Sequence, residues 1–145
     1  MTIFEELRRD HDRQRELLNS LVRTEGESDQ RQHEYKALKE QLQIHALAEE
    51  RYFYAPLMES DKTVSMSRHG IAEHHAIDKL IEELDNTEMS SPAWLHWMKK
   101  LQHKVEHHLE DEEHSFFQLA GKVLDDKEKN SLASDYKEEM AKQLS

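Results

Sequence analysis

The chain has 145 residues and no cysteine, with 20 basic residues, 31 acidic residues and a formal net charge of −11. A chain of this length is expected to fold as one domain (1–145) around a single core. The missing cysteine excludes disulfides, thiolate metal sites and iron–sulfur clusters. The acidic balance, without any basic cluster, predicts no nucleic-acid partner. The acidic N-terminus shows no signal peptide, and no apolar run approaches the roughly 20 residues that cross a bilayer. We therefore expect no membrane partner and a cytoplasmic location.

The pattern of apolar residues predicts four long helices and a shorter fifth. Only 3 Gly and 2 Pro are present, so few turns are encoded, and apolar residues recur at steps of three and four. The helices are expected at about residues 2–23, 30–57, 64–87, 92–124 and 126–144. Thr2 and Glu5 have the capping-box spacing at the first helix, and Ser91-Pro92 has the N-cap and N1 residues of the fourth.

Short connections between long helices determine the predicted fold class. The first four helices are joined by roughly five to eight residues, which favours antiparallel neighbours. We therefore predict an all-α protein, an up-down-up-down four-helix bundle over about residues 2–124. The short fifth helix, at about 126–144, follows the bundle at its C-terminal end.

The most informative motif is a repeated His-x-x-x-Glu pair. His45 and Glu49 in the second helix recur as His108 and Glu112 in the fourth, and aromatic residues follow both pairs at the same offsets. Residues four apart on a helix lie one turn above each other on the same face. Each pair therefore points one imidazole and one carboxylate in the same direction.

Six polar residues interrupt the apolar helix faces, and they are His11, His45, Glu49, His74, His108 and Glu112. At about 1.5 Å per residue, antiparallel packing places them in one layer some 12–15 Å from one end of the bundle. Burying two carboxylates without partners costs several kcal/mol. A hydrogen-bonded core network of His–Glu pairs is the alternative, but six converging groups favour a metal site.

The types of donor atom limit the choice of metal ion. Imidazole and carboxylate without thiolate suit iron, with manganese or zinc also possible. Two histidines would serve each ion, with both carboxylates shared: His11 and His45 on one ion, His74 and His108 on the other, Glu49 and Glu112 between them. A bridging water or hydroxide would leave a position for a small molecule. Structural zinc sites are closed, so this open arrangement favours redox or ligand chemistry.

These motifs give the chain a resemblance to the hemerythrin-like, or HHE cation-binding, domains. The resemblance covers about residues 2–124, and its motifs in chain order are His11-Asp12, His45-x-x-x-Glu49, Glu73-His74 and His108-x-x-x-Glu112. It implies a four-helix bundle around an oxo- or hydroxo-bridged non-haem di-iron centre. Ferritin-like di-iron bundles instead use Glu-x-x-His, and no histidine here has a glutamate three residues before it.

One departure from the family's oxygen carriers affects the predicted function. They have a fifth histidine one turn before the residue matching His74, where this chain has Gly70. With two histidines on each metal, the chain looks more like the family's iron-centre repair and nitric-oxide-response members. We expect a protein that binds, senses or handles oxygen, nitric oxide, peroxide or iron itself. The alternatives are a di-iron oxidoreductase or peroxidase-like enzyme, and a helical interaction module with a structural metal site.

Several neighbours of the six residues carry further expectations. Tyr52 is interpreted as a core aromatic, with hydrogen bonding to a carboxylate ligand as the alternative. Asp12 and Arg15 form either a pair that orients His11 or a surface pair. His69 or Glu73 would reach the metal only if the third helix were distorted.

The remaining polar and apolar faces give two more predictions. Six histidines fall on polar faces and are expected at the surface: His33, His75, His96, His103, His107 and His114. In the fifth helix, Leu132, Tyr136 and Met140 follow one another at four-residue steps. This face is a candidate surface for a homodimer or another partner.

Overall fold

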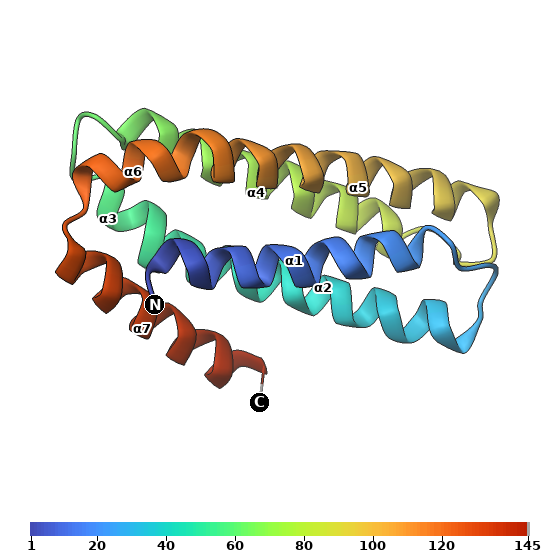
Figure 1. Ribbon diagram of the computed structural model, residues 1–145. Helices are drawn as coiled ribbons and strands as arrows, with labels where there is room; N and C mark the ends of the chain where they lie inside the picture. Colours follow the sequence, from blue (N-terminus) through green and yellow to red (C-terminus); the bar gives the residue numbers. More distant parts are fainter. Residues whose placement is uncertain (145) are drawn as a thin grey trace.

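The computed structural model describes residues 1–144 and shows an all-helical bundle, which confirms the predicted fold class (Figure 1). The α-helices run over α1 (Ile3–Leu21), α2 (Asp29–Glu49), α3 (Ala55–Leu57), α4 (Val64–Asp85), α5 (Pro92–Asp111), α6 (Phe117–Val123) and α7 (Asp126–Leu144). The four long elements lie antiparallel, and α7 lies outside them along the N-terminal half of α1. Within residues 1–144, no helix is both long enough and apolar enough to cross a membrane.

Two of the predicted helices contain a π-helical turn. The element expected at 30–57 is α2 followed by η1 (Glu50–Tyr54) and α3, and the element expected at 92–124 is α5 followed by η2 (Glu112–Phe116) and α6. A π turn takes one more residue than an α turn, so it shifts the face on which every later residue lies. Both π turns occur at the repeated His-x-x-x-Glu pairs, and the sequence periodicity did not reveal them.

Three helices begin at side-chain caps, of which Thr2 and Ser91 were predicted from the sequence and Ser28 was not. The Thr2 hydroxyl accepts from the Glu5 backbone N–H at 3.3 Å, and the Glu5 carboxylate accepts from the Thr2 backbone N–H at 3.0 Å. Ser28 and Ser91 cap α2 and α5 through their hydroxyl oxygens. These caps set where α1, α2 and α5 begin, and therefore the depth of each polar side chain in the bundle.

The apolar core is divided into two clusters by a polar layer. One cluster contains Ile3, Leu7, Phe53 and Tyr136, and it lies at the end of the bundle that α7 covers. The other contains Leu17, Leu18, Leu21, Leu38, Ile81, Trp94 and Leu101, and it lies toward the opposite end. Along α1, His11 separates the two sets. Each cluster excludes water from one side of the polar layer.

The face of α7 that we considered for a homodimer is occupied within the chain. Tyr136 and Met140 are only 1% and 6% exposed, and Leu132 is partly buried against the same core cluster. These residues pack against α1, α2 and η1. The prediction that they form a partner surface is therefore wrong, because they complete the bundle of their own chain.

Candidate metal centre

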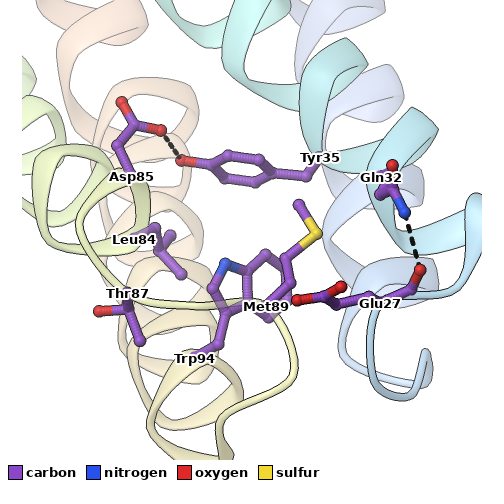
Figure 2. A pocket seen from close by; sticks show the side chains of 8 residues that line it. All are labelled: Glu27, Gln32, Tyr35, Leu84, Asp85, Thr87, Met89 and Trp94. Atoms are coloured by element: carbon purple, nitrogen blue, oxygen red, sulfur yellow. Dashed lines mark hydrogen bonds between the residues drawn. The ribbon is translucent and has the colours of Figure 1, made fainter.

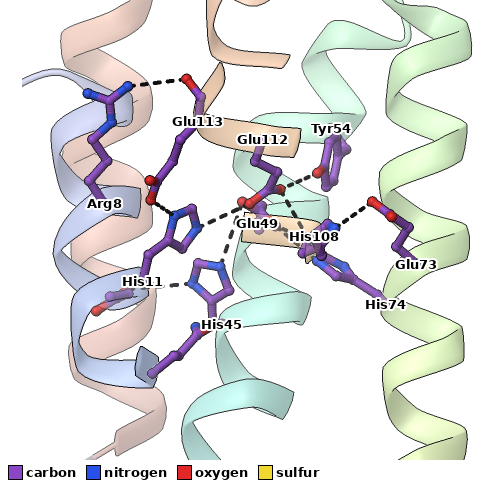
Figure 3. Close-up of polar contacts among 12 residues, drawn as sticks. Arg8, His11, His45, Glu49, Tyr54, Glu73, His74, His108, Glu112 and Glu113 are labelled. Carbon is purple, nitrogen blue, oxygen red and sulfur yellow. Dashed lines mark hydrogen bonds and ion pairs between the residues drawn. The ribbon is translucent and has the colours of Figure 1, made fainter. Parts of the chain in front are cut away.

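The structure brings all six predicted residues together in one buried layer (Figure 3). They come from four sides of the bundle: His11 from α1, His45 and Glu49 from α2, His74 from α4, His108 from α5, and Glu112 from η2. All six residues are buried, and none is more than 4% exposed. The layer is therefore shielded from solvent on every side.

The donor atoms form two overlapping sets. One set is His11, His45, Glu49 and Glu112, the other is His74, His108, Glu49 and Glu112, and within each set the donor atoms lie within 4.8 Å of one another. Glu49 and Glu112 belong to both sets, so each carboxylate lies between two pairs of imidazoles. This arrangement offers two adjacent metal positions with shared carboxylates.

The atoms that face the middle of the layer form no hydrogen bonds, although Nε2 of His11 lies 3.1 Å from Oε1 of Glu112 and Nε2 of His74 lies 2.9 Å from Oε1 of Glu49. They are Nε2 of His11, His45, His74 and His108, both carboxylate oxygens of Glu49, and Oε1 of Glu112. Leaving buried polar atoms unsatisfied costs about 1–3 kcal/mol each. Metal ions would satisfy all of them at once, because neutral imidazole and carboxylate are the donors that iron, manganese and zinc accept. The residues present therefore fit a metal centre.

Each histidine is held by its other ring nitrogen. The partners of Nδ1 are Glu113 for His11 at 2.7 Å, the Tyr136 hydroxyl for His45 at 2.5 Å, Glu50 for His74 at 2.8 Å, and Glu73 for His108 at 2.7 Å. Such partners fix the ring orientation and the tautomer, and they increase the basicity of the free nitrogen. All four imidazoles are thus oriented with Nε2 toward the shared carboxylates.

Two of these partners immediately follow a shared carboxylate in the chain. Glu49 faces the layer while Glu50 holds His74, and Glu112 faces the layer while Glu113 holds His11. The doublet Glu-Glu is visible in both copies of the sequence repeat. The sequence interpretation used only the first glutamate of each doublet, so it missed the roles of Glu50 and Glu113.

The expected Asp12–Arg15 pair exists, but it does not orient His11 directly. Arg15 donates to Asp12 at 3.1 Å and to Glu113 at 2.9 Å. Glu113 then accepts from His11. Burial raises the pKa of Glu113, but the hydrogen bonds from His11 and Arg15 outweigh this and lower the pKa to about 2. Glu113 therefore remains an acceptor for His11 at any physiological pH.

Glu73 and Tyr136 do not belong to the donor sets of the buried layer, but each hydrogen-bonds to one of their histidines. We had considered that His69 or Glu73 would reach the metal through a distorted helix. Instead, Glu73 accepts a hydrogen bond from His108, and His69 lies at the surface. Tyr136 accepts from His45 and donates to Asp10, which makes a relay from α2 through α7 to α1. The fifth helix therefore contributes to the site, which its position in the sequence did not indicate.

The tyrosine that reaches the site is Tyr54, and Tyr52 is a core aromatic, as expected, rather than the hydrogen-bond donor of the alternative interpretation. The Tyr54 hydroxyl donates to Oε2 of Glu112, while Tyr52 is half-buried against the apolar cluster. The π turn η1 causes the change, because its extra residue rotates Tyr54 into the position that a regular helix would give to an earlier residue.

Gly70 accommodates the Tyr54 ring. A Cβ atom at position 70 would lie 2.2 Å from a carbon of the ring, well inside van der Waals contact. Tyr54 thus fills the space beside the residue where the family's oxygen carriers have a fifth histidine. The absence of a side chain at Gly70 is what permits a phenol at this side of the layer.

Charge interactions across the layer perturb the pKa of several groups when no metal is bound. Burial lowers the pKa of His11 and of His74, but their hydrogen bonds to carboxylates dominate and raise each pKa to about 9. Burial raises the pKa of Glu112, while His108 and His11 hold it well below its ordinary value. Burial and the charges of Glu112 and Glu49 raise the pKa of Tyr54. The phenol therefore stays protonated at neutral pH.

Metal uptake is expected to release protons. His11 and His74 have a pKa of about 9 without metal, and the nearby carboxylates raise the pKa of His108 well above its ordinary value, so these imidazoles are protonated at pH 7 and must lose a proton to bind an ion. We expect release of about two to three protons per loaded chain at pH 7 and a metal affinity that falls as the pH is lowered. Calorimetric titration in buffers with different ionisation enthalpies measures the number, and heats that do not depend on the buffer would contradict it.

Tyr136→Phe is expected to weaken metal binding by about 10–100-fold without unfolding the protein, as losses of such partners do. The change removes only the hydroxyl that bridges His45 and Asp10, while the ring keeps its place in the core. Competition with a chelator of known affinity measures the change. Tyr35→Phe, which removes a hydroxyl paired with Asp85 in the other core cluster, is the control and should leave metal affinity unchanged.

The six remaining histidines on polar faces lie at the surface, as expected, and they are His33, His75, His96, His103, His107 and His114. None of them belongs to either donor set of the buried layer. On α5 and η2, His108 and Glu112 are the buried pair, whereas His107 is exposed and Asp111 partly exposed.

Two cavities differ in their relation to the site. A hollow of about 480 Å³ lies at the opposite end of the bundle, where Tyr35 and Trp94 line it and Tyr35 donates to Asp85 (Figure 2). None of the six residues lines this hollow. A cavity of only about 10 Å³ instead touches His45, His74 and His108, which is room for about one water molecule.

The small cavity has a neighbour at the surface. It is lined partly by Ala46 and Asp78, and both residues also line an open hollow of about 250 Å³ between α2 and α4. The short side chain of Ala46 leaves little protein between the two spaces. The α2–α4 seam is therefore the thinnest cover along this side of the layer.

A buried set of imidazoles and carboxylates inside an antiparallel helical bundle defines a helical metal-binding protein. Residues 2–120 match the family model described as the Hemerythrin HHE cation binding domain. The chain therefore belongs to this family, whose members bind metal ions, typically iron.

A solved structure supports the same fold. The chain is similar to a Hemerythrin HHE cation binding domain-containing protein from Mycobacterium kansasii, with 21% identity and a TM-score of 0.87. The match covers 99% of this chain and 87% of that chain. No curated protein matches the sequence significantly. At this sequence identity the similarity shows the fold alone.

Proposed function

We propose that this chain is a non-haem di-iron protein whose centre binds and handles a small redox ligand such as oxygen, nitric oxide or peroxide. The supporting observation is the set of buried donor atoms without partners, arranged as two overlapping groups of two histidines and two shared glutamates. Two iron ions held there would supply one-electron and ligand-binding chemistry. His11, His45, His74 and His108 would hold them, with Glu49 and Glu112 between the ions.

The surroundings of the site favour a ligand of a few atoms. The cavity beside His45, His74 and His108 measures about 10 Å³, and the apolar side chains of Leu42, Ile77 and Val105 form much of its wall. A diatomic molecule or peroxide needs little more space than a water molecule, whereas a larger organic substrate would require the helices to separate. The residues around the centre thus select by size and limit the access of water.

The proposal is tested by metal content and absorption spectra together. After anaerobic reconstitution with Fe²⁺, we expect about two irons per chain, as a site with two sets of donors requires. Oxidation should produce absorption bands of an oxo- or carboxylate-bridged ferric pair, and nitric oxide should change the spectrum of the reduced form. Only trace iron after reconstitution would overturn the proposal.

Tyr54 favours a second candidate function, the enzymatic consumption of peroxide. Its buried hydroxyl donates to Glu112, and its ring lies edge-on to His74 with a centroid distance of 5.7 Å. A protonated phenol at the edge of the donor sets is placed to give a proton to a bound ligand.

The variant Tyr54→Phe separates these two candidates. If the protein consumes peroxide, the variant should keep its iron and lose about 10²-fold or more in rate, as expected for the removal of an acid–base group. Tyr52→Phe is the matched control, because Tyr52 packs against the apolar cluster two residues earlier. Peroxide consumption no faster than that of free iron in the wild type would leave ligand binding as the function.

A further inference from the structure

A third group of side chains with possible metal donor atoms lies outside the buried layer, between α4 and α5. His69, Glu73 and Asp111 each offer one donor atom, and the three atoms lie within 4.8 Å of one another. Glu73 is only 5% exposed, Asp111 is partly exposed, and His69 is at the surface. The cluster is therefore open to solvent on one side and closed on the side that faces the buried layer.

The cluster repeats the arrangement of the buried layer on the outside of the bundle. His69 and Glu73 are four residues apart on α4, and His107 and Asp111 are four residues apart on α5. Nε2 of His69 lies 3.6 Å from Oε2 of Glu73, and Nε2 of His107 lies 3.3 Å from Oδ2 of Asp111. Two neighbouring helices thus again present paired imidazoles and carboxylates to each other.

The two oxygens of Glu73 face different partners. Oε1 accepts from Nδ1 of His108 at 2.7 Å, as Figure 3 shows, while Oε2 lies on the side of His69. The His69 ring also packs edge-on against Phe116, with a centroid distance of 6.0 Å, which restrains this surface side chain. Glu73 therefore connects the outer cluster to a histidine of the buried layer.

We propose that His69, Glu73 and Asp111 form an accessory site for a divalent transition-metal ion. One imidazole and two carboxylates, without thiolate, suit Zn²⁺, Fe²⁺ or Mn²⁺, and water completes the coordination on the open side. His107 contacts Asp111 but does not belong to the group of three donors. An ion at this site acts on the buried centre through Glu73, because it draws charge from the carboxylate that holds His108.

Lys104 limits the affinity of the accessory site. Burial raises the pKa of Glu73, but its interaction with His108, and more weakly with His69 and Lys104, lowers the pKa. The positive charge of Lys104 therefore acts on the same carboxylate that a metal ion would use. Binding is expected to be weaker than at the buried layer, and Lys104→Gln should tighten it several-fold.

The accessory site is tested by counting two metals at once. Iron-loaded protein is dialysed against Zn²⁺, and zinc and iron per chain are then measured in the same sample. We expect the wild type to hold about one zinc more than His69→Ala and about one more than Asp111→Asn, with iron unchanged in all three. His103→Ala, which removes an exposed histidine from the same helix α5, is the matched control and should bind zinc as the wild type does.

The link to the buried centre has its own readout. Zinc binding should shift the absorption bands of the loaded iron in the wild type, and Asp111→Asn should abolish the shift. Equal zinc content in the wild type and His69→Ala would overturn the accessory site. Only the link through Glu73 rests on the proposed di-iron function. If no iron loads, the same difference of about one zinc between the wild type and His69→Ala still tests the site.

Discussion

Glu49→Ala is expected to remove nearly all bound iron and to lower the unfolding midpoint by an amount on the order of 10 °C. Glu49 belongs to both donor sets, and its two buried oxygens form no hydrogen bond and face imidazoles of both sets, so its loss weakens both metal positions together. A ligand present at 1,000 times its Kd stabilises a protein by about 4 kcal/mol. For a chain of this size, each kcal/mol corresponds to about 2–4 °C.

The control for this prediction is Glu40→Ala, which removes an exposed glutamate from the same helix α2. It should keep the iron content and the midpoint of the wild type. Chelation of the wild type should reproduce the loss of stability, because in both cases the folded state loses the ions that it alone can bind. If chelation leaves the midpoint unchanged, the metal does not stabilise the fold, and this prediction is wrong.

Helical geometry explains why the sequence led to the six residues. His11, His45 and His74 lie within regular helices, so counting residues from the helix ends gives their depth. Glu49 and Glu112 follow their histidines by four residues, before most of each π turn has changed the register. Five of the six converging residues lie in regular α-helix, and Glu112 is the first residue of η2.

The position of Tyr54 could not be predicted from helical periodicity. A π turn depends on the packing and hydrogen bonding of the whole site, and the local sequence carries no pattern that marks it. The sequence offered Tyr52 only as an alternative hydrogen-bond donor, and the contact of Tyr54 with Glu112 appeared only in the structure. Since Gly70 lacks a side chain, it had been interpreted as a missing ligand, whereas its role in the structure is to accommodate the phenol ring.

The residues that hold the histidines were missed for two different reasons. Glu50 and Glu113 stood in the sequence as the second glutamates of a repeated doublet, so a closer comparison of the two copies could have found them. Tyr136 could not be found in this way. Its contact with His45 depends on how α7 packs across the bundle, and the sequence of α7 does not fix that angle.

Gly70→Ala is expected to destabilise the protein by about 1–3 kcal/mol or more, the range found for overpacked cores. Alanine is ordinarily the better helix former, by about 0.5–1 kcal/mol, and position 70 lies inside α4. The added Cβ, however, would lie 2.2 Å from the Tyr54 ring. The ring has to move, so Glu112 loses its donor, and the absorption bands of the loaded centre should shift along with the midpoint.

Two further variants show whether the cost arises from this contact. Gly121→Ala, also in a helix, adds a Cβ that meets no atom within 4 Å, so it should be neutral or stabilise by about 0.4–1 kcal/mol. In the background of Tyr54→Ala, the Gly70→Ala change should lose most of its cost, since the two residues are in direct contact and their effects are coupled. Additive losses in the double variant would show that Gly70 serves some purpose other than making room for Tyr54. The same cycle, followed by iron spectra, tests whether Tyr54 controls the environment of Glu112, because only variants that displace the phenol should alter the bands.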